Sequence, residues 1–127
     1  MSRNDGEFHL VMTFSRSVAG EEETHRQWYD REHLKDVCQV SGFVAAHRYE
    51  AVPSGMDLGD MPPQTALAVY EVEGDLDEAV TRLRRAMKAG EIAFSPALDT
   101  GAITTWTFRR ASSVEAAEGR ETPTDGV

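Results

Sequence analysis

The sequence predicts a single α+β domain whose elements follow the order strand, helix, strand, strand, helix, strand (βαββαβ). Three observations lead to this prediction. Four short segments alternate in polarity with the period of two that strands require, and two longer segments repeat apolar residues at helical spacing. The chain has 127 residues, which is enough for one hydrophobic core and too few for two domains.

Residues 7–14 predict the first strand, which follows a polar segment at 1–6 that we expect to be flexible. Apolar side chains occur at every second position from Phe8 to Phe14, as in a strand with one buried face. The opposite parity also carries an apolar residue, Val11. We therefore expect both faces of this strand to be at least partly covered.

The stretch from Thr24 to Gly42 predicts the first helix. Three consecutive glutamates precede it and suit the positive end of a helix dipole. On a helical wheel, Tyr29, His33 and Val37 fall on the face that a helix normally buries. Either His33 is a core histidine that hydrogen-bonds a backbone carbonyl, or it is a functional group that faces a cavity.

The rest of the folded region predicts three more strands and a second helix. Alternating side chains indicate strands at 43–51, 66–73 and 101–109. Apolar residues at helical spacing indicate a helix at 76–89, with Asp75 in position to cap its first turn. We therefore place the folded domain at 7–110.

Two further segments lack a periodic pattern. The residues at 52–65 include three prolines and two glycines and predict a loop, which nevertheless carries Met56, Leu58 and Met61. Apolar side chains on a long loop indicate a lid or a dimer contact, and both remain open. The composition of 111–127 is rich in Ala, Ser, Glu, Gly, Thr and Pro and predicts a disordered tail.

This order of elements is typical of a ferredoxin-like fold, in which two helices cover one face of a four-stranded antiparallel sheet. The other face of such a sheet is bare. Because the strands carry apolar residues on both faces, we expect a second copy of the chain to bury it. Two sheets that pair about a twofold axis would close a barrel, so the sequence predicts a homodimer.

The first helix and second strand also carry the run W-Y-D-R-E-H-L-K-D-V-C-Q-V-S-G-F at 28–43. This run resembles the W-Y-D-x-x-H-L-P-D-V-x-x-x-P-G-F signature of the dimeric α/β-barrel superfamily, specifically its EthD-like branch. Lys35 and Ser41 stand where the signature has proline. The resemblance implies the same fold and dimer as the order of elements.

The resemblance further implies a substrate pocket between the helices and the sheet. His33 would point into this pocket, with Tyr29 one turn earlier and Trp28 at the rim. Strand residues that face the helices would complete the wall. Candidates for substrate contacts are Tyr70, Trp106, Phe108 and the cation Arg48, but the parity of the strands is open.

These residues favour a cofactor-independent enzyme that acts on a hydrophobic, aromatic or polyketide-like small molecule. An imidazole with a pKa near neutrality can remove a proton next to a carbonyl group while a phenol hydrogen-bonds the enolate oxygen. His33 would be the acid or base and Tyr29 its partner. The same pair suits cyclisation, dehydration, isomerisation or decarboxylation.

Other functions remain open. One alternative is a cofactor-free monooxygenase that oxidises a bound phenolate, and another is a dimer that binds a small ligand without turnover. Haem binding through His33 fits less well. We expect no metal, because the sequence contains neither an H-x-x-x-H pair nor an H-E-x-x-H motif.

The charge of the chain limits the class of partner. A net charge of −9 argues against nucleic acid and anionic membranes, which both require a basic surface. No apolar run approaches the roughly 20 residues of a membrane span. The single cysteine, Cys38, cannot form an internal disulfide, so we expect a core role for it and a cytoplasmic protein.

Overall fold

The structure is a computed structural model that describes residues 8–117 and 119. Four strands form one antiparallel sheet in the order β2-β3-β1-β4. Their bounds are β1 Phe8–Ser15, β2 Phe43–Glu50, β3 Ala66–Glu73 and β4 Thr104–Phe108. The predicted α+β, ferredoxin-like architecture is therefore confirmed.

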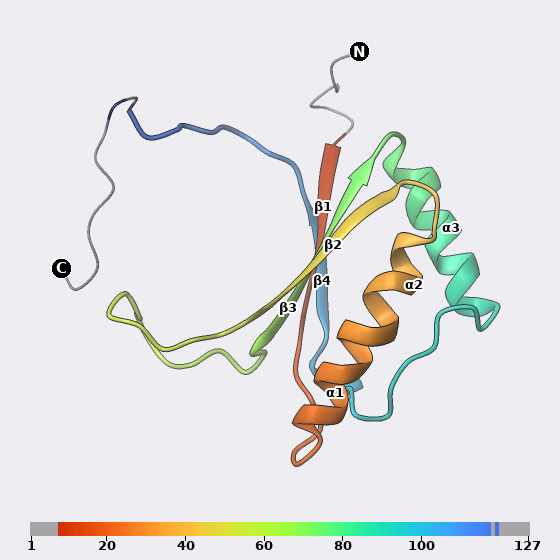
Figure 1. Ribbon diagram of the computed structural model, residues 1–127, viewed down its shortest axis with the longest axis horizontal. Helices are drawn as coiled ribbons and strands as arrows, with labels where there is room; N and C mark the ends of the chain where they lie inside the picture. Colours follow the sequence, from red (N-terminus) through yellow and green to blue (C-terminus); the bar gives the residue numbers. More distant parts are fainter. Residues whose placement is uncertain (1–7, 118, 120–127) are drawn as a thin grey trace.

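Two helical segments form one layer over one face of this sheet, as Figure 1 shows. The first is a continuous run of α1 (Glu22–Trp28), a π-helical turn η2 (Tyr29–His33) and α2 (Leu34–Cys38). The second is α3 (Leu76–Lys88). Asp75 caps α3 as predicted, because its carboxylate accepts a hydrogen bond from the backbone N–H of Glu78 at 3.0 Å.

The π-helical turn is the one irregularity in the continuous helix from α1 to α2. At its end the backbone N–H of Leu34 donates to the carbonyl oxygen of Tyr29, five residues earlier. Such turns are rare and occur often at functional sites, because the extra residue redirects the side chains around it. Here Tyr29 and His33 begin and end the turn, and both are buried.

Gly42 lies in the turn that joins α2 to β2. Its φ is +104°, and a Cβ at this position would lie 2.8 Å from the Cβ of Ala79 in α3. A side chain there would be strained by the backbone angle and would also push the two helices apart. Glycine therefore sets both the turn and the close approach of α3.

The last strand differs from the prediction at 101–109. Residues Thr100–Ala102 form a 3₁₀ turn, η3, and β4 begins only at Thr104. Asp99 stabilises this turn, because its carboxylate accepts a hydrogen bond from the backbone N–H of Gly101 at 3.1 Å. The short polar side chain thus competes with strand pairing at this point.

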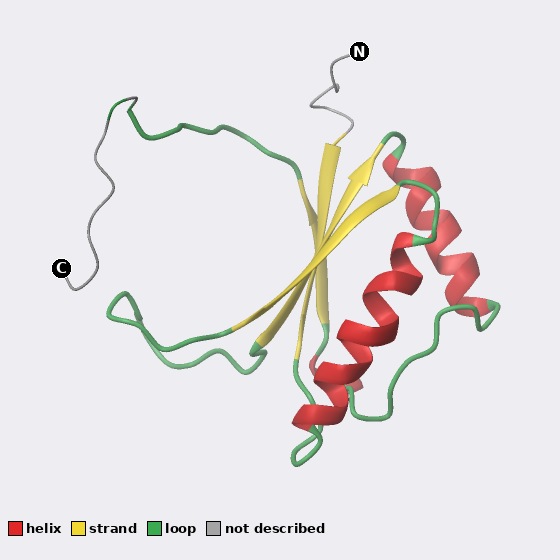
Figure 2. Cartoon of the chain, viewed as in Figure 1, coloured by secondary structure: helices red, strands yellow, loops and turns green. Residues whose placement is uncertain are grey.

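The second face of the sheet has no helix over it. Residues 51–65 and 109–117 extend on that side, away from the helices (Figure 2). The face carries several apolar side chains that are largely exposed, namely Tyr49, Trp106 and Phe108. It also carries an ion pair between His47 and Glu71, with 2.9 Å between Nε2 and Oε2.

The two ends of the chain relate differently to the predictions. The proposed flexible segment 1–6 lies outside the described residues. Of the predicted tail at 111–127, residues 111–117 and 119 are described; they form no helix or strand and are exposed. None of the helices in the described part of the chain has the length and apolar composition that a bilayer crossing requires.

Candidate functional site

A cavity of about 250 Å³ lies between the helices and the covered face of the sheet. Its volume is near the lower end of the range for small-molecule sites. Most of its wall is apolar, and its polar side-chain atoms come from four aromatic or imidazole residues and two threonines. The lining residues are Val11, Thr13, Trp28, Tyr29, His33, Val37, Tyr70, Leu83, Met87, Phe94, Leu98, Ile103 and Thr105.

His33 lies in the wall of this cavity and is only 6% exposed. Its ring stacks on Trp28, with 4.4 Å between the ring centroids. Nδ1 is buried and has no hydrogen-bond partner in the described part of the chain. The imidazole is therefore buried as a core residue would be, but this nitrogen is not satisfied as a core residue requires.

The environment of His33 corrects one expectation about its chemistry. Burial lowers the pKa of His33 from its usual 6.5 to about 4, and the nearby carboxylate of Asp36 opposes this only in part. The sequence-based expectation of a pKa near neutrality is therefore wrong. At neutral pH the imidazole is uncharged and presents an unprotonated nitrogen.

Tyr29 and Tyr70 are the two phenols of the cavity, and their hydroxyl groups differ. The hydroxyl of Tyr29 is hydrogen-bonded to Oγ of Ser15 in β1, at 3.3 Å. The hydroxyl of Tyr70 in β3 is buried without a partner among the described residues. Burial raises the pKa of both tyrosines, so both remain protonated at neutral pH.

Aromatic packing holds these rings in fixed positions. Tyr29 lies edge-on to His33, with 5.4 Å between ring centroids, and Tyr70 does the same at 6.4 Å. The indole N–H of Trp28 donates to the carbonyl oxygen of Ala93 at 3.1 Å. The predicted residues Trp28, Tyr29, His33 and Tyr70 are thus brought together by α1, η2 and β3.

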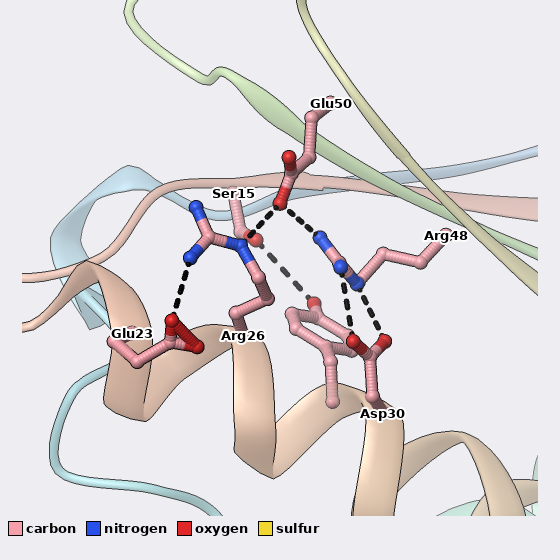
Figure 3. A network of polar contacts seen from close by, with 7 residues as sticks. Ser15, Glu23, Arg26, Asp30, Arg48 and Glu50 are labelled. Carbon is pink, nitrogen blue, oxygen red and sulfur yellow. Dashed lines mark hydrogen bonds and ion pairs between the residues drawn. The ribbon is translucent and has the colours of Figure 1, made fainter.

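Arg48 does not line the cavity. Its guanidinium donates to both carboxylate oxygens of Asp30, at 2.8 and 3.1 Å, and also to Glu50. Hydrogen bonds to Asp30 raise the pKa of Arg48 above its usual value. Figure 3 shows that Glu50 links this pair to Arg26, which also contacts Glu23.

The charge of Arg48 is therefore matched within the protein. Two carboxylates face one guanidinium, so we do not assign to Arg48 the substrate contact that the sequence indicated. Its contacts instead fasten the η2 turn to β2, because Asp30 lies in that turn. The polar residues beside the buried helix face are thus explained by ion pairs with the sheet.

Trp106 and Phe108 are not brought to the cavity. They pair with Met12 and Leu10 of β1, whereas the cavity residue Thr105 pairs with Thr13. Since neighbouring residues of a strand point to opposite faces, Trp106 and Phe108 lie on the face without helices. Trp106 is 68% exposed there. The prediction that these two residues line the cavity wall is therefore wrong.

Sequence reasoning missed Phe94 and Ser15. Phe94 comes from the irregular segment after α3, and its ring centroid lies 5.7 Å from that of His33. Ser15 is the last residue of β1 and is fully buried. Nothing in the pattern around Phe94 marks it as a site residue. The parity of Ser15 with Val11 and Thr13 is a signal that could have placed it on the covered face.

Within the described ranges, no group of three or more His, Cys, Asp or Glu side chains could hold a metal ion. The residues of the cavity offer one imidazole, phenols and aromatic rings, which suit an uncharged aromatic molecule. The fold and cavity together define an α+β protein with an apolar cavity between its helices and its sheet.

Solved structures of other proteins share this fold. One is a protein from Shewanella loihica PV-4 described as a "putative monooxygenase", with a TM-score of 0.57 and 12% sequence identity over 84% of this chain and 97% of that one. Another is an ethyl tert-butyl ether D (EthD) family protein from Bacillus halodurans C-125, with a TM-score of 0.56 and 12% identity over 82% of this chain and 98% of that one.

No protein-family model matches this sequence, and no curated protein matches it significantly. At 12% identity, the likeness to the two solved structures establishes the fold that this chain shares with them. The EthD-like resemblance of residues 28–43 is thereby confirmed at the level of fold.

Proposed function

We propose that the protein is a cofactor-independent enzyme that removes a proton next to the carbonyl group of an apolar, aromatic or polyketide-like substrate. The observation that carries this proposal is the unpartnered Nδ1 of His33, which is buried in the wall of an apolar cavity. A buried nitrogen without a partner costs stability, so its retention is better explained by contact with a ligand.

The proposed step transfers one proton. The C–H bond next to the carbonyl group breaks, its electron pair moves to form an enolate, and the proton passes to the imidazole of His33. Burial makes His33 a weak base, so the enolate oxygen needs a hydrogen-bond donor close by. A phenol of the cavity wall, Tyr29 or Tyr70, supplies it. The enolate then leads to cyclisation, isomerisation or dehydration according to the substrate.

The same proposal includes a homodimer. The face of the sheet without helices exposes Trp106 and Phe108, which a monomer would leave in water. A second copy that packs its own bare face against this one would cover both, as in a closed barrel. The His47–Glu71 ion pair would then lie within the interface.

We assign the loop at 51–65 to this interface and not to a lid. It extends on the side of the bare face (Figure 1), whereas the cavity lies on the side of the helices, and no loop residue appears among those that line the cavity. Met56 and Leu58 in the loop are more than four-fifths exposed in the single chain. Contact with a partner subunit would bury them.

Hydrogen exchange in D₂O tests the proposed reaction without knowledge of the natural substrate. An enzyme that forms enolates accelerates loss of the methyl signal of acetophenone in the proton NMR spectrum, and larger ketones such as 1-tetralone and 2-acetylnaphthalene extend the test. We expect catalysed exchange under argon. Exchange at the buffer rate for all three ketones would contradict the proposal.

Two other functions make different predictions in the same experiment. The Shewanella protein of similar fold is described as a monooxygenase, so one alternative is a cofactor-free monooxygenase. Such an enzyme would consume dioxygen with a phenolic substrate and would be inactive under argon. A dimer that only binds its ligand would shift the NMR signals of the protein without exchange of the ketone. Oxygen consumption and ketone exchange therefore separate the three functions.

A further inference from the structure

The two phenols of the cavity are not equivalent as donors to a ligand. Tyr29 already shares a hydrogen bond with Ser15, at 3.3 Å, and both residues are almost completely buried. Tyr70 is 4% exposed, and its hydroxyl has no partner in the part of the chain that the structure describes. A donor that is buried and unused needs an acceptor, and Tyr70 is one of the residues that line the cavity.

The charge of the cavity limits what that acceptor is. Besides the two tyrosines, His33 is the one titratable residue among those that line it, and burial keeps its imidazole neutral. The guanidinium of Arg48 lies outside the lining and is matched by Asp30 and Glu50. A carboxylate ligand would therefore lose its hydration without gaining a counter-ion, which is unfavourable.

We propose that Tyr70 donates a hydrogen bond to an uncharged oxygen of the ligand, the carbonyl oxygen of an aryl ketone, and that Tyr29 is a positioning residue whose hydroxyl stays on Ser15. This proposal rests on the proposed function for the location of the ligand. It assigns the enolate-stabilising role to a residue on the sheet and the proton transfer to a residue on the helix.

The arrangement of the rings supports this division. Tyr70 and His33 come from opposite walls of the cavity, and their rings lie edge-on with 6.4 Å between centroids. The two rings pack directly against each other, and both residues line the cavity, so a small ketone in the cavity beside them would present its oxygen to Tyr70 and an adjacent carbon to His33. The ring of Tyr29 lies 5.4 Å from that of His33 and fixes the orientation of the imidazole.

Binding of three matched probes tests the proposal. Acetophenone carries the carbonyl group, ethylbenzene replaces it with an apolar group of similar shape, and benzoate replaces it with a carboxylate. Each is titrated into ¹⁵N-labelled protein and followed by NMR chemical shifts. The variants are Tyr70→Phe and, as the comparison that removes the hydroxyl of the other candidate donor, Tyr29→Phe. Tyr70→Phe keeps the ring and removes only a hydroxyl without a partner, so we expect it to fold.

We expect Tyr70→Phe to raise the Kd for acetophenone by about three- to tenfold, as loss of one hydrogen bond does, and to leave the Kd for ethylbenzene unchanged. Tyr29→Phe should leave both unchanged, and the wild type should bind benzoate more weakly than acetophenone. An unchanged acetophenone Kd in Tyr70→Phe, an equal loss in Tyr29→Phe, or benzoate binding as tight as that of acetophenone would each overturn the assignment.

The binding experiment is independent of turnover. If Tyr70 fails this test while ketone exchange still depends on His33, the proposed function stands and only the donor is wrong. If the Tyr70 result is as expected but no ketone exchanges, the cavity binds aryl ketones and the catalytic proposal fails. The two claims therefore have separate outcomes.

Discussion

His33 lies stacked on Trp28, with 4.4 Å between ring centroids and 27° between ring planes. The indole excludes water from one face of the imidazole and leaves it neutral. Trp28 directly precedes the π-helical turn and His33 is its last residue, so this contact spans the turn. The π-helical turn thus positions the stack, and the stack helps to keep the proposed base uncharged.

The pH dependence of stability follows from this burial. The pKa of His33 is lowered from 6.5 to about 4, so the unfolded state takes up a proton before the folded state does. Stability is therefore complete above pH 6.5 and falls as the pH drops toward 4, by up to about 3 kcal/mol. Burial of His25 acts in the same direction. Urea unfolding at pH 7.5 and pH 5 measures the loss.

The variant His33→Gln should lose part of this pH dependence, because it removes the group that titrates. Lys35→Gln, an exposed residue two positions later on the same helix, serves as the control and should keep the wild-type difference. Equal slopes in the wild type and His33→Gln would show that His33 does not have a lowered pKa.

If the bare face of the sheet forms the proposed dimer interface, a charge placed on that face should disrupt the dimer. Light scattering after size exclusion should report twice the chain mass of 14.0 kDa. Trp106→Glu should weaken or abolish the dimer, because it places a carboxylate in an apolar interface. Gln39→Glu adds the same charge at an exposed position after α2 and should not. A wild-type monomer at micromolar concentration would contradict the barrel.

Removal of residues 111–127 should leave the melting temperature nearly unchanged. The described part of this segment, 111–117 and 119, is exposed and forms no helix or strand, so its loss removes little buried surface. Differential scanning calorimetry of the truncated and full chains measures the change. A decrease of more than about 5 °C, on the order of 1 kcal/mol, would show that the segment docks.

Local patterns in the sequence were sufficient for most of the fold. The alternation at 66–73 predicts β3 with its observed bounds, and Asp75 caps α3 as expected. Apolar spacing also places Tyr29, His33 and Val37 on the buried face of the helix. In each case the signal lies within a few neighbouring residues, where periodicity and capping act.

The features that define the site depend on distant residues. The π-helical turn at 29–33 has no sequence signal, and its ion pair with Arg48 joins it to β2. The face on which Trp106 lies is set by its pairing with Met12, far along the chain. The lowered pKa of His33 and the unpartnered hydroxyl of Tyr70 follow from tertiary packing alone.

The central claim is that His33 takes the proton, and one variant tests it most directly. The rate of ketone exchange in D₂O and the melting temperature are measured together on His33→Gln. We predict a folded protein whose exchange is slower by roughly 10² to 10⁴, the usual effect of a general base, with a melting temperature equal to or above that of the wild type. Exchange at the wild-type rate, or a loss of activity no greater than the loss of folded protein, would contradict the account.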